Sequence, residues 1–289
     1  PRMIDPRSPI KLRIAVVILG HEGGGIRRFL LNQLAHSAEH GLDFEYVCLH
    51  AGPLHDALRD AGAKTTVVGG FVPTVYPHGP LLAFARWLFP GGGFGATLRA
   101  LRNYFAQNKP DVIYSHFLHT HIVSALAARK TRIPVIGQVH GTLNVRRLFG
   151  LTRIAYSLAL ACSLDTMVMV SETARKSLWG PARRKARMIY NAVDVQAIEQ
   201  RVAGAVKTPG RAIIVGRLGS GKKIDLAIRA LPHVLAAGID CTLEIVGGPA
   251  DDSSAYFRRL TEEVAAWGLQ DRVVFTGPIN PPYALLAAA

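Results

Sequence analysis

Residues 12–25 read Leu-Arg-Ile-Ala-Val-Val-Ile-Leu-Gly-His-Glu-Gly-Gly-Gly, and this stretch decides the fold. Its first eight residues are of strand length and apolar except for Arg13, which is typical of a strand buried on both faces. Three glycines follow, and a helical pattern continues from them to about residue 40. A buried strand, a glycine-rich turn and a helix form the opening unit of a doubly wound α/β domain.

The alternation of strand and helix continues along almost the whole chain. Strands are predicted at 12–19, 44–49, 64–68, 112–115, 134–139, 166–170, 185–190, 211–215, 242–246 and 272–276, and helices at 53–61, 80–107 (interrupted at 90–93), 119–129, 150–162, 222–237 and 254–267. Strands separated by helices of this length predict parallel sheets covered by helices on both faces, with ligands at the carboxyl ends of the strands.

A polar segment without strand pattern, from about 195 to 210, is the predicted linker. It divides the chain into an N-terminal Rossmann-like domain, 1–205, and a C-terminal Rossmann-like domain, 206–289. The final residues, 283–289, are the start of a helix that nothing caps, so we expect the second domain to be incomplete.

Composition excludes several classes of protein. With 289 residues, 49% of them hydrophobic and 19% charged, the chain is long and apolar enough for two packed cores. Apolar runs are too short to cross a membrane, and the first residues do not have the pattern of a secretory signal, so we expect none. Cys48, Cys162 and Cys241 are widely spaced, which argues against a disulfide scaffold and a zinc site. We therefore expect a cytoplasmic protein.

The formal net charge is +14, from 34 basic and 20 acidic side chains. Many of the basic residues gather in one part of the chain: Arg146, Arg147, Arg153, Arg175, Lys176, Arg183, Arg184, Lys185 and Arg187. Nucleic acid, an anionic membrane or a phosphorylated substrate would each accept such a surface, and a solvated surface without a dedicated partner is the alternative.

The glycines at 23–25 are a candidate phosphate site. They let a backbone approach a phosphate, and the helix that follows presents free N–H groups and the positive end of its dipole. A tight turn without a ligand is the alternative reading. The pattern is not G-x-G-x-x-G, and the second strand ends at Cys48-Leu49-His50 without the acidic residue of a nicotinamide site, so a dehydrogenase is not favoured.

Gly216-Arg-Leu-Gly-Ser-Gly-Lys222-Lys223 nearly matches the phosphate loop of P-loop enzymes. Lys223 stands where a serine or threonine would hold magnesium, and a second cation there would repel the metal. Arg217 and Lys222 remain, and they suit a diphosphate held without a metal ion.

Motifs in both predicted domains follow one another in a distinctive order and spacing. They are Gly23-Gly-Gly-Ile-Arg-Arg28, Pro110-Asp-Val-Ile-Tyr-Ser-His116, Gln138-Val-His-Gly141, Val170-Ser-Glu172, Ile189-Tyr-Asn-Ala-Val-Asp194, Val215-Gly-Arg-Leu218 with Lys222, Leu243-Glu-Ile-Val-Gly-Gly-Pro249 and Arg272-Val-Val-Phe-Thr-Gly277. Together they resemble the retaining glycosyltransferases of family four, the "glycosyl transferases group 1" type. The resemblance implies the GT-B architecture, in which two Rossmann-like domains face each other across a cleft.

The resemblance also implies roles for individual residues. His140 would hydrogen-bond the donor sugar near the reacting centre, and Arg217 and Lys222 would bind the diphosphate and stabilise charge on the departing nucleotide. The other donor-binding positions would be Gly24, Gly25, His116, Asn191, Gly216, Gly247 and Gly248. No metal and no cofactor are expected, because the nucleotide sugar is a substrate. For both histidines a purely structural role is the alternative.

Three departures from the family pattern stand out. Lys223 and Ala192 occupy positions where the family commonly has glycine. The family also carries two glutamates separated by seven residues, and none of the eight glutamates here has a glutamate eight positions on. That motif would fall beyond residue 289, so we expect this chain alone to transfer no sugar.

The resemblance and the charge together suggest the acceptor. Members of this family often act at the cytoplasmic membrane face, which implies a lipid-linked or cell-envelope glycan and peripheral contact with anionic membrane. Residues 81–89, an apolar and aromatic stretch containing Arg86, could rest at a lipid interface, or form an ordinary packed helix. A nucleotide-sugar epimerase of the same architecture is the rival enzyme. Nucleic-acid binding is not expected, because the chain has no helix-turn-helix, RNP-like aromatics or zinc-finger spacing.

Overall fold

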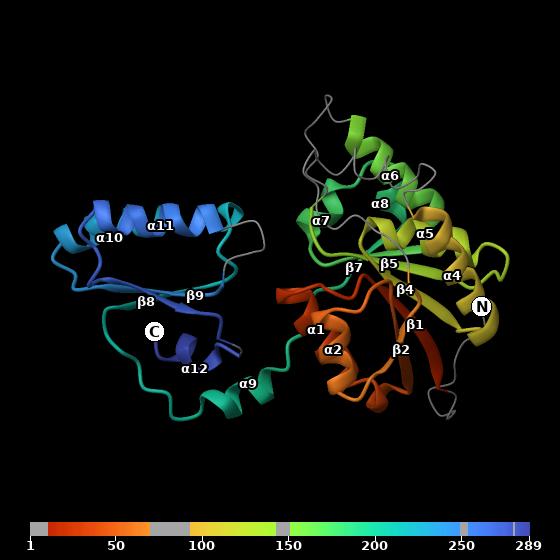
Figure 1. Cartoon of the computed structure of the whole chain (residues 1–289), viewed down its shortest axis with the longest axis horizontal. Helices are drawn as coiled ribbons and strands as arrows, with labels where there is room; N and C mark the ends of the chain where they lie inside the picture. The colour runs from red at the N-terminus through yellow and green to blue at the C-terminus, as the bar shows by residue number, and fades with distance from the viewer. Residues whose placement is uncertain (1–10, 70–92, 143–150, 249–253, 280) are drawn as a thin grey trace. The chain divides into compact units, whose positions relative to one another are not determined.

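The computed structural model describes residues 11–69, 93–142, 151–248, 254–279 and 281–289 (Figure 1). Contacts divide the chain into two compact units, Pro1–Ala192 and Val193–Ala289. Each unit is built on a parallel sheet of its own, as the sequence predicts.

Unit 1 contains a seven-stranded sheet of order β3-β2-β1-β4-β5-β6-β7. Its strands are β1 (Leu12–Ile18), β2 (Leu42–Cys48), β3 (Lys64–Val67), β4 (Val112–His116), β5 (Val135–Val139), β6 (Thr166–Met169) and β7 (Ala186–Met188). Its helices are α1 (Gly24–Ala35), the 3-10 turn η1 (Ala38–His40), α2 (Pro53–Asp60), α4 (Phe94–Asn108), α5 (Leu118–Ala128), α6 (Leu151–Ser163), α7 (Glu172–Ser177) and α8 (Pro181–Lys185). The strand order reverses between β1 and β4, which is where a doubly wound sheet opens a crevice for ligands.

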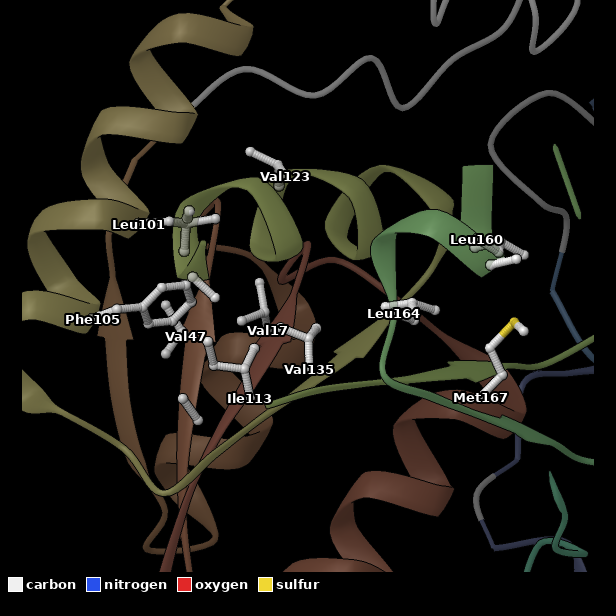
Figure 2. Close-up of a cluster of buried hydrophobic side chains, with 14 of the residues drawn as sticks. Val17, Val47, Leu101, Phe105, Ile113, Val123, Val135, Leu160, Leu164 and Met167 are labelled. Carbon is white, nitrogen blue, oxygen red and sulfur yellow. The ribbon is translucent and has the colours of Figure 1, made fainter. Parts of the chain in front are cut away.

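Both faces of this sheet are covered, because successive side chains of a buried strand point to opposite sides. On one face Val17, Val47 and Ile113 point toward Leu101 and Phe105 of α4, as Figure 2 shows. On the other face the core is built from alternate strand positions and from α1 and α2, and includes Val16, Ile18, Phe44, Tyr46, Leu30, Leu54 and Leu58. The prediction of a doubly covered parallel sheet is confirmed for this unit.

Unit 2 contains a three-stranded sheet of order β10-β9-β8. Its elements are α9 (Val195–Val202), β8 (Arg211–Val215), the 3-10 turn η3 (Ser220–Lys222), α10 (Ile224–Ala236), β9 (Thr242–Val246), α11 (Ser254–Ala266), β10 (Val273–Gly277) and α12 (Tyr283–Ala287).

Only one face of the unit 2 sheet is fully covered by the described residues. Ile228 of α10 and Leu260 of α11 pack against Ile245 of β9 in a buried core. On the other face Val215 is 39% exposed and Val274 51% exposed. The prediction that helices cover both faces of the sheet is therefore wrong at Val215 and Val274 of unit 2.

The predicted linker at 195–210 contains a helix that the sequence analysis missed. Asp194 caps α9, since its carboxylate accepts a hydrogen bond from the backbone N–H of Ala197 at 2.9 Å. α9 packs against α12. Contacts therefore divide the units after Ala192, whereas the sequence analysis places the domain boundary at 205/206.

Other parts of the chain have helices that the sequence analysis did not predict, or lie outside the described residues. The short helices α7 and α8 were missed, although Ser171 is a recognisable N-cap whose hydroxyl accepts from Ala174 N at 3.1 Å. Residues 81–89 with Arg86, and Arg146 and Arg147, lie outside the described residues. No helix in the described part of the chain combines the length and the apolar character that crossing a bilayer requires.

Candidate functional site

The glycine turn after β1 lies at the carboxyl edge of the unit 1 sheet and is open. An added side-chain carbon at Gly24 or Gly25 would meet no atom within 4 Å, and Gly24 has a positive φ of 62°. The N-cap residue of α1 is Gly23, which has no side chain to accept from the first amides of the helix. Amides at a helix start that are left without such a cap suit an anion.

Glu22, which the sequence analysis did not single out, holds this turn. It is buried, and its carboxylate accepts hydrogen bonds from the backbone N–H groups of Leu19 at 2.6 Å and Gly20 at 2.7 Å. These two amides end β1, so Glu22 ties the strand to the turn. The sequence shows an acidic residue directly before three glycines. Only the structure shows that its side chain turns back to bond the backbone at the end of β1.

His116 and His140 lie together beside α1. Their rings stack with centroids 5.1 Å apart, and His116 Nδ1 lies 2.8 Å from His140 Nε2. Phe29, on α1, packs its ring edge against His140 with centroids 5.8 Å apart. The strand order explains the pairing, because β4 and β5 are neighbours, His116 is the last residue of β4 and His140 directly follows β5.

Both histidines are uncharged at neutral pH. Burial lowers the pKa of His116 well below its usual range, and the neighbouring His140 lowers it further. Burial lowers the pKa of His140 to about 4. The Nε2 atom of His116 is buried and has no hydrogen-bond partner among the described residues. A neutral imidazole can donate or accept a hydrogen bond, which suits recognition of a hydroxyl group.

Two further buried histidines, missed by the sequence analysis, lie on α5, which follows β4. His121 Nδ1 lies 2.8 Å from the hydroxyl of Ser115, and burial lowers the pKa of His121 to about 3. His119 is also buried, and its pKa falls to about 4 for the same reason. The spacing of His116, His119 and His121 around one strand end was visible in the sequence, but their burial was not.

Two backbone features allow this close packing. Gly137 in β5 leaves room for His121, since a side-chain carbon there would lie 3.0 Å from His121 Nδ1. Phe117 follows β4 with φ 78°, a left-handed conformation that is costly for a residue with a side chain. Backbone strain of this kind concentrates at functional sites.

Asn191 is connected to the same edge by hydrogen bonds. The hydroxyl of Tyr114 donates to the side-chain oxygen of Gln138, whose amide donates to Asn191 Oδ1 at 3.2 Å. Tyr114 also packs edge-on against His116, with centroids 4.7 Å apart. Of the site residues predicted for unit 1, the structure thus links His116, His140 and Asn191, and sets the helix that begins at Gly24 beside them.

The site residues predicted for unit 2 meet at the carboxyl edge of its own sheet. A side-chain carbon at Gly247 would overlap the carbonyl oxygen of Gly216, so the ends of β8 and β9 touch here. Leu218 N donates to Gly248 O at 2.9 Å and joins the same two ends. The Lys222 side chain lies over Gly216, because a carbon added there would be 3.7 Å from its Cε atom.

The charges at this edge are exposed. Arg217, Lys222 and Lys223 are all solvent-accessible, and within the described residues none of the three forms an ion pair. Glycines bring the backbone to the surface beside Arg217 and Lys222, an arrangement that suits a diphosphate. No cluster of three metal-binding side chains occurs in the parts of the chain that the structure covers.

Comparison with known proteins identifies the family. The model of Glycosyltransferase Family 4 matches residues 23–197, which is more than half of the chain. The chain belongs to glycosyltransferase family 4. The model of Glycosyl transferases group 1 matches residues 209–289, so both units are covered by models of glycosyltransferases.

The relatives that carry a specific enzyme name share little sequence with this chain. A D-inositol 3-phosphate glycosyltransferase of Acidothermus cellulolyticus is 26% identical over 288 residues, which is 90% of this chain and 62% of the relative. A UDP-Gal:alpha-D-GlcNAc-diphosphoundecaprenol alpha-1,3-galactosyltransferase of Escherichia coli is 28% identical over 45% of this chain and 30% of its own length. The chain spans 48% to 66% of the length of the first relatives that it matches.

A solved structure shows the same fold. The crystal structure of Anabaena HepE in complex with UDP-glucose matches with a TM-score of 0.72 at 16% identity, over 96% of this chain and 72% of that chain. Other solved structures of this fold include the galactosyltransferase WaaB and a UDP-GlcNAc 2-epimerase of Methanocaldococcus jannaschii, so this likeness confirms the predicted fold and does not by itself separate the two activities.

Proposed function

We propose that the protein transfers a hexosyl-type group from a nucleoside diphosphate sugar to an acceptor, with retention at the anomeric carbon and without a metal ion. The observation that carries the proposal is the carboxyl edge of unit 2. There, Gly216 and Gly247 bring two strand ends into contact beside the unpaired cations Arg217 and Lys222. Supporting this donor class, a protein of the same fold was crystallised with UDP-glucose.

Arg217 and Lys222 act on the leaving group in this proposal. When the bond between the sugar and the diphosphate breaks, negative charge grows on the diphosphate oxygens, and two fixed cations stabilise that charge. Gly247 and Gly248 leave space for the nucleotide. Retention follows from the family resemblance and not from any distance in the structure.

The unit 1 edge binds the sugar in this proposal. His140, neutral because its pKa is about 4, hydrogen-bonds a sugar hydroxyl, while His116 holds its ring by stacking. The open amides at Gly24 and Gly25 face the donor diphosphate. Asn191 contributes a side-chain amide at the same edge.

We further propose a lipid-linked or cell-envelope glycan as the acceptor, at the cytoplasmic face of the membrane. The support is the name of the Escherichia coli relative, whose acceptor carries an undecaprenol diphosphate, together with the basic character of this chain. Positive charge attracts a protein to anionic lipid.

Binding of UDP and GDP to the 289-residue chain, measured by calorimetry, tests the donor site. We expect Arg217→Ala and Lys222→Ala each to weaken binding about tenfold or more, because each removes a charge-assisted hydrogen bond. Lys223→Ala is the matched control, an exposed cation next in sequence, and should change binding less than about threefold. Equal effects at all three positions would show that general charge, not a built site, attracts the nucleotide.

A transfer assay tests the reaction. We expect no turnover by the 289-residue chain alone, as the sequence analysis predicts, and retention at the anomeric carbon in the product of any longer form that is active. Epimerisation of the donor sugar without an acceptor would contradict transfer and support the rival enzyme.

A further inference from the structure

One basic surface has no part in the proposed donor site. It lies where α7 turns into α8, and we call it the α7–α8 corner: Arg175, Lys176, Trp179, Arg183 and Arg184 (Figure 1). Four of its residues, Arg175, Trp179, Arg183 and Arg184, together with Gly180, line a surface hollow of about 480 Å³. Trp179 is 38% exposed inside this ring of cations.

The corner is held rigidly on unit 1. Leu178 and Ala182 are fully buried in the core on either side of Trp179. The backbone N–H of Trp179 donates to the buried hydroxyl of Ser157 on α6 at 3.0 Å. Arg183 Nη2 donates to two backbone carbonyls at the end of α7, those of Lys176 at 3.0 Å and Leu178 at 2.9 Å. Trp179 therefore stays at the surface because the chain on both sides of it is anchored.

Charge around the corner is strongly unbalanced. Residues 166–193 contain six basic side chains and one acidic side chain, Glu172. Glu172 is paired with Arg175 at 2.8 Å, and Lys185 donates to backbone carbonyls of α6 and the residue after it. Lys176 and Arg184 are exposed and form no ion pair among the described residues, so their charges are available to a partner.

We propose that the α7–α8 corner binds anionic lipid headgroups at a membrane surface. An exposed tryptophan sits favourably at a lipid–water interface, where its ring contacts acyl chains and its N–H meets water. Arginine and lysine around it reach lipid phosphates, and each such cation adds about 1 kcal/mol of attraction to an anionic surface. This inference deepens the proposed function, since a lipid-linked acceptor lies in such a surface, but lipid binding needs neither donor nor turnover.

Co-sedimentation of the 289-residue chain with vesicles tests the proposal. We expect binding to phosphatidylcholine vesicles containing phosphatidylglycerol and little binding to phosphatidylcholine alone. The double variant Lys176→Glu with Arg184→Glu should weaken binding to the anionic vesicles about tenfold or more. Both side chains are exposed, so circular dichroism should show an unchanged fold.

A control variant with the same change in net charge distinguishes binding by the α7–α8 corner from attraction by the total charge of the protein. Lys207→Glu with Arg258→Glu reverses two exposed cations of unit 2 and should weaken binding much less. Equal loss in the two double variants would overturn the proposal. Competition with inorganic phosphate distinguishes the source of the phosphate group: loss of vesicle binding at low millimolar phosphate would mean a free-phosphate site instead.

The fluorescence of Trp179 reports directly on contact between the α7–α8 corner and lipid. The chain has three tryptophans, so Trp87→Phe with Trp267→Phe leaves Trp179 alone. We expect its emission to shift to the blue on anionic vesicles and to be quenched by brominated lipid. No shift while the protein still binds would place the contact elsewhere and overturn the proposal. Binding to random duplex DNA but not to vesicles would do the same, and would identify a nucleic-acid surface.

Discussion

The two parallel sheets of this protein differ in how they are covered. In unit 1 helices bury both faces, and the carboxyl edge holds neutral, stacked histidines. In unit 2 the described helices bury one face, Val274 on the other is 51% exposed, and the carboxyl edge carries exposed cations. Buried positions at a strand end can hold neutral hydrogen-bonding groups, whereas an exposed edge can keep charges without the cost of burying them. In the function proposed above, the first setting serves the sugar and the second serves the diphosphate.

Acid should destabilise unit 1 far more than unit 2, and this is the largest effect that we expect. His119, His121 and His140 have lowered pKa values in the folded state, so the unfolded chain binds protons more readily. Their stabilising contribution is complete above pH about 6.5 and is lost as pH falls toward 4. Between pH 7 and pH 5 the loss is about 2 kcal/mol for His119 alone.

Hydrogen exchange followed by peptide measures this contrast. Amides of β4 and α5 should lose protection at pH 5 after correction for intrinsic rates, while those of β8 and β9 should not. Unit 2 has one histidine, the exposed His233, and His233→Gln should change nothing. Equal loss of protection in both units would contradict the role of the buried histidines.

Gly247→Ala should damage unit 2 alone. The new methyl group would overlap the carbonyl oxygen of Gly216, and forcing apart two packed strand ends costs about 2–3 kcal/mol. We expect urea to unfold unit 2 earlier and UDP binding to be lost. Gly248→Ala is the matched control for stability only, because its added carbon would approach Pro278 no closer than 3.8 Å. If both variants are equally stable, the ends of β8 and β9 are not in contact.

A matched pair of strand substitutions measures directly how the burial of the unit 1 sheet differs from that of the open face of the unit 2 sheet. Val17→Thr places a hydroxyl in the fully buried core of unit 1 and should cost about 1–2 kcal/mol. Val274→Thr makes the same change on the open face of unit 2 and should stay within about 0.5 kcal/mol. Urea titrations of the two variants give both values. A large cost at Val274 would mean that this face is covered in solution.

Lys223→Gly should give the smallest change, a stabilisation of about 0.5 kcal/mol. Lys223 has φ 53°, a left-handed conformation that glycine adopts without steric cost. Lys109→Gly in unit 1, at φ 43°, is the matched substitution and should stabilise by a similar amount. Thermal unfolding checks both, and destabilisation at Lys223 would indicate that its side chain makes a contact that the backbone does not reveal.

The sequence analysis worked best where local pattern and final packing agree. Apolar runs such as 12–19 became strands, and glycines at strand ends became the turns of both sheets. It failed at α9, where the capping residue Asp194 was present but the polar stretch behind it suggested a linker. It also missed α7 and α8, which are too short for a helical period to show.

Some residues of the candidate site could likewise be predicted from the sequence, and others could not. Gly216 and Lys222 could be chosen from sequence because they lie in a glycine-rich loop directly after a predicted strand, and Gly247 could be chosen through the family resemblance. The supporting residues could not, since Glu22, His121 and Gln138 act through partners that only the strand order brings near.

The sequence by itself determined the α/β class, the strand–turn–helix units and the family, since all three depend on patterns within short stretches of chain. Only the tertiary structure decided that His116 stacks on His140, that burial leaves both uncharged, and that one sheet is covered on both faces while the other is partly open. The physical reason is that burial and pKa depend on segments distant in sequence, whose approach is set by the order of strands in the sheet.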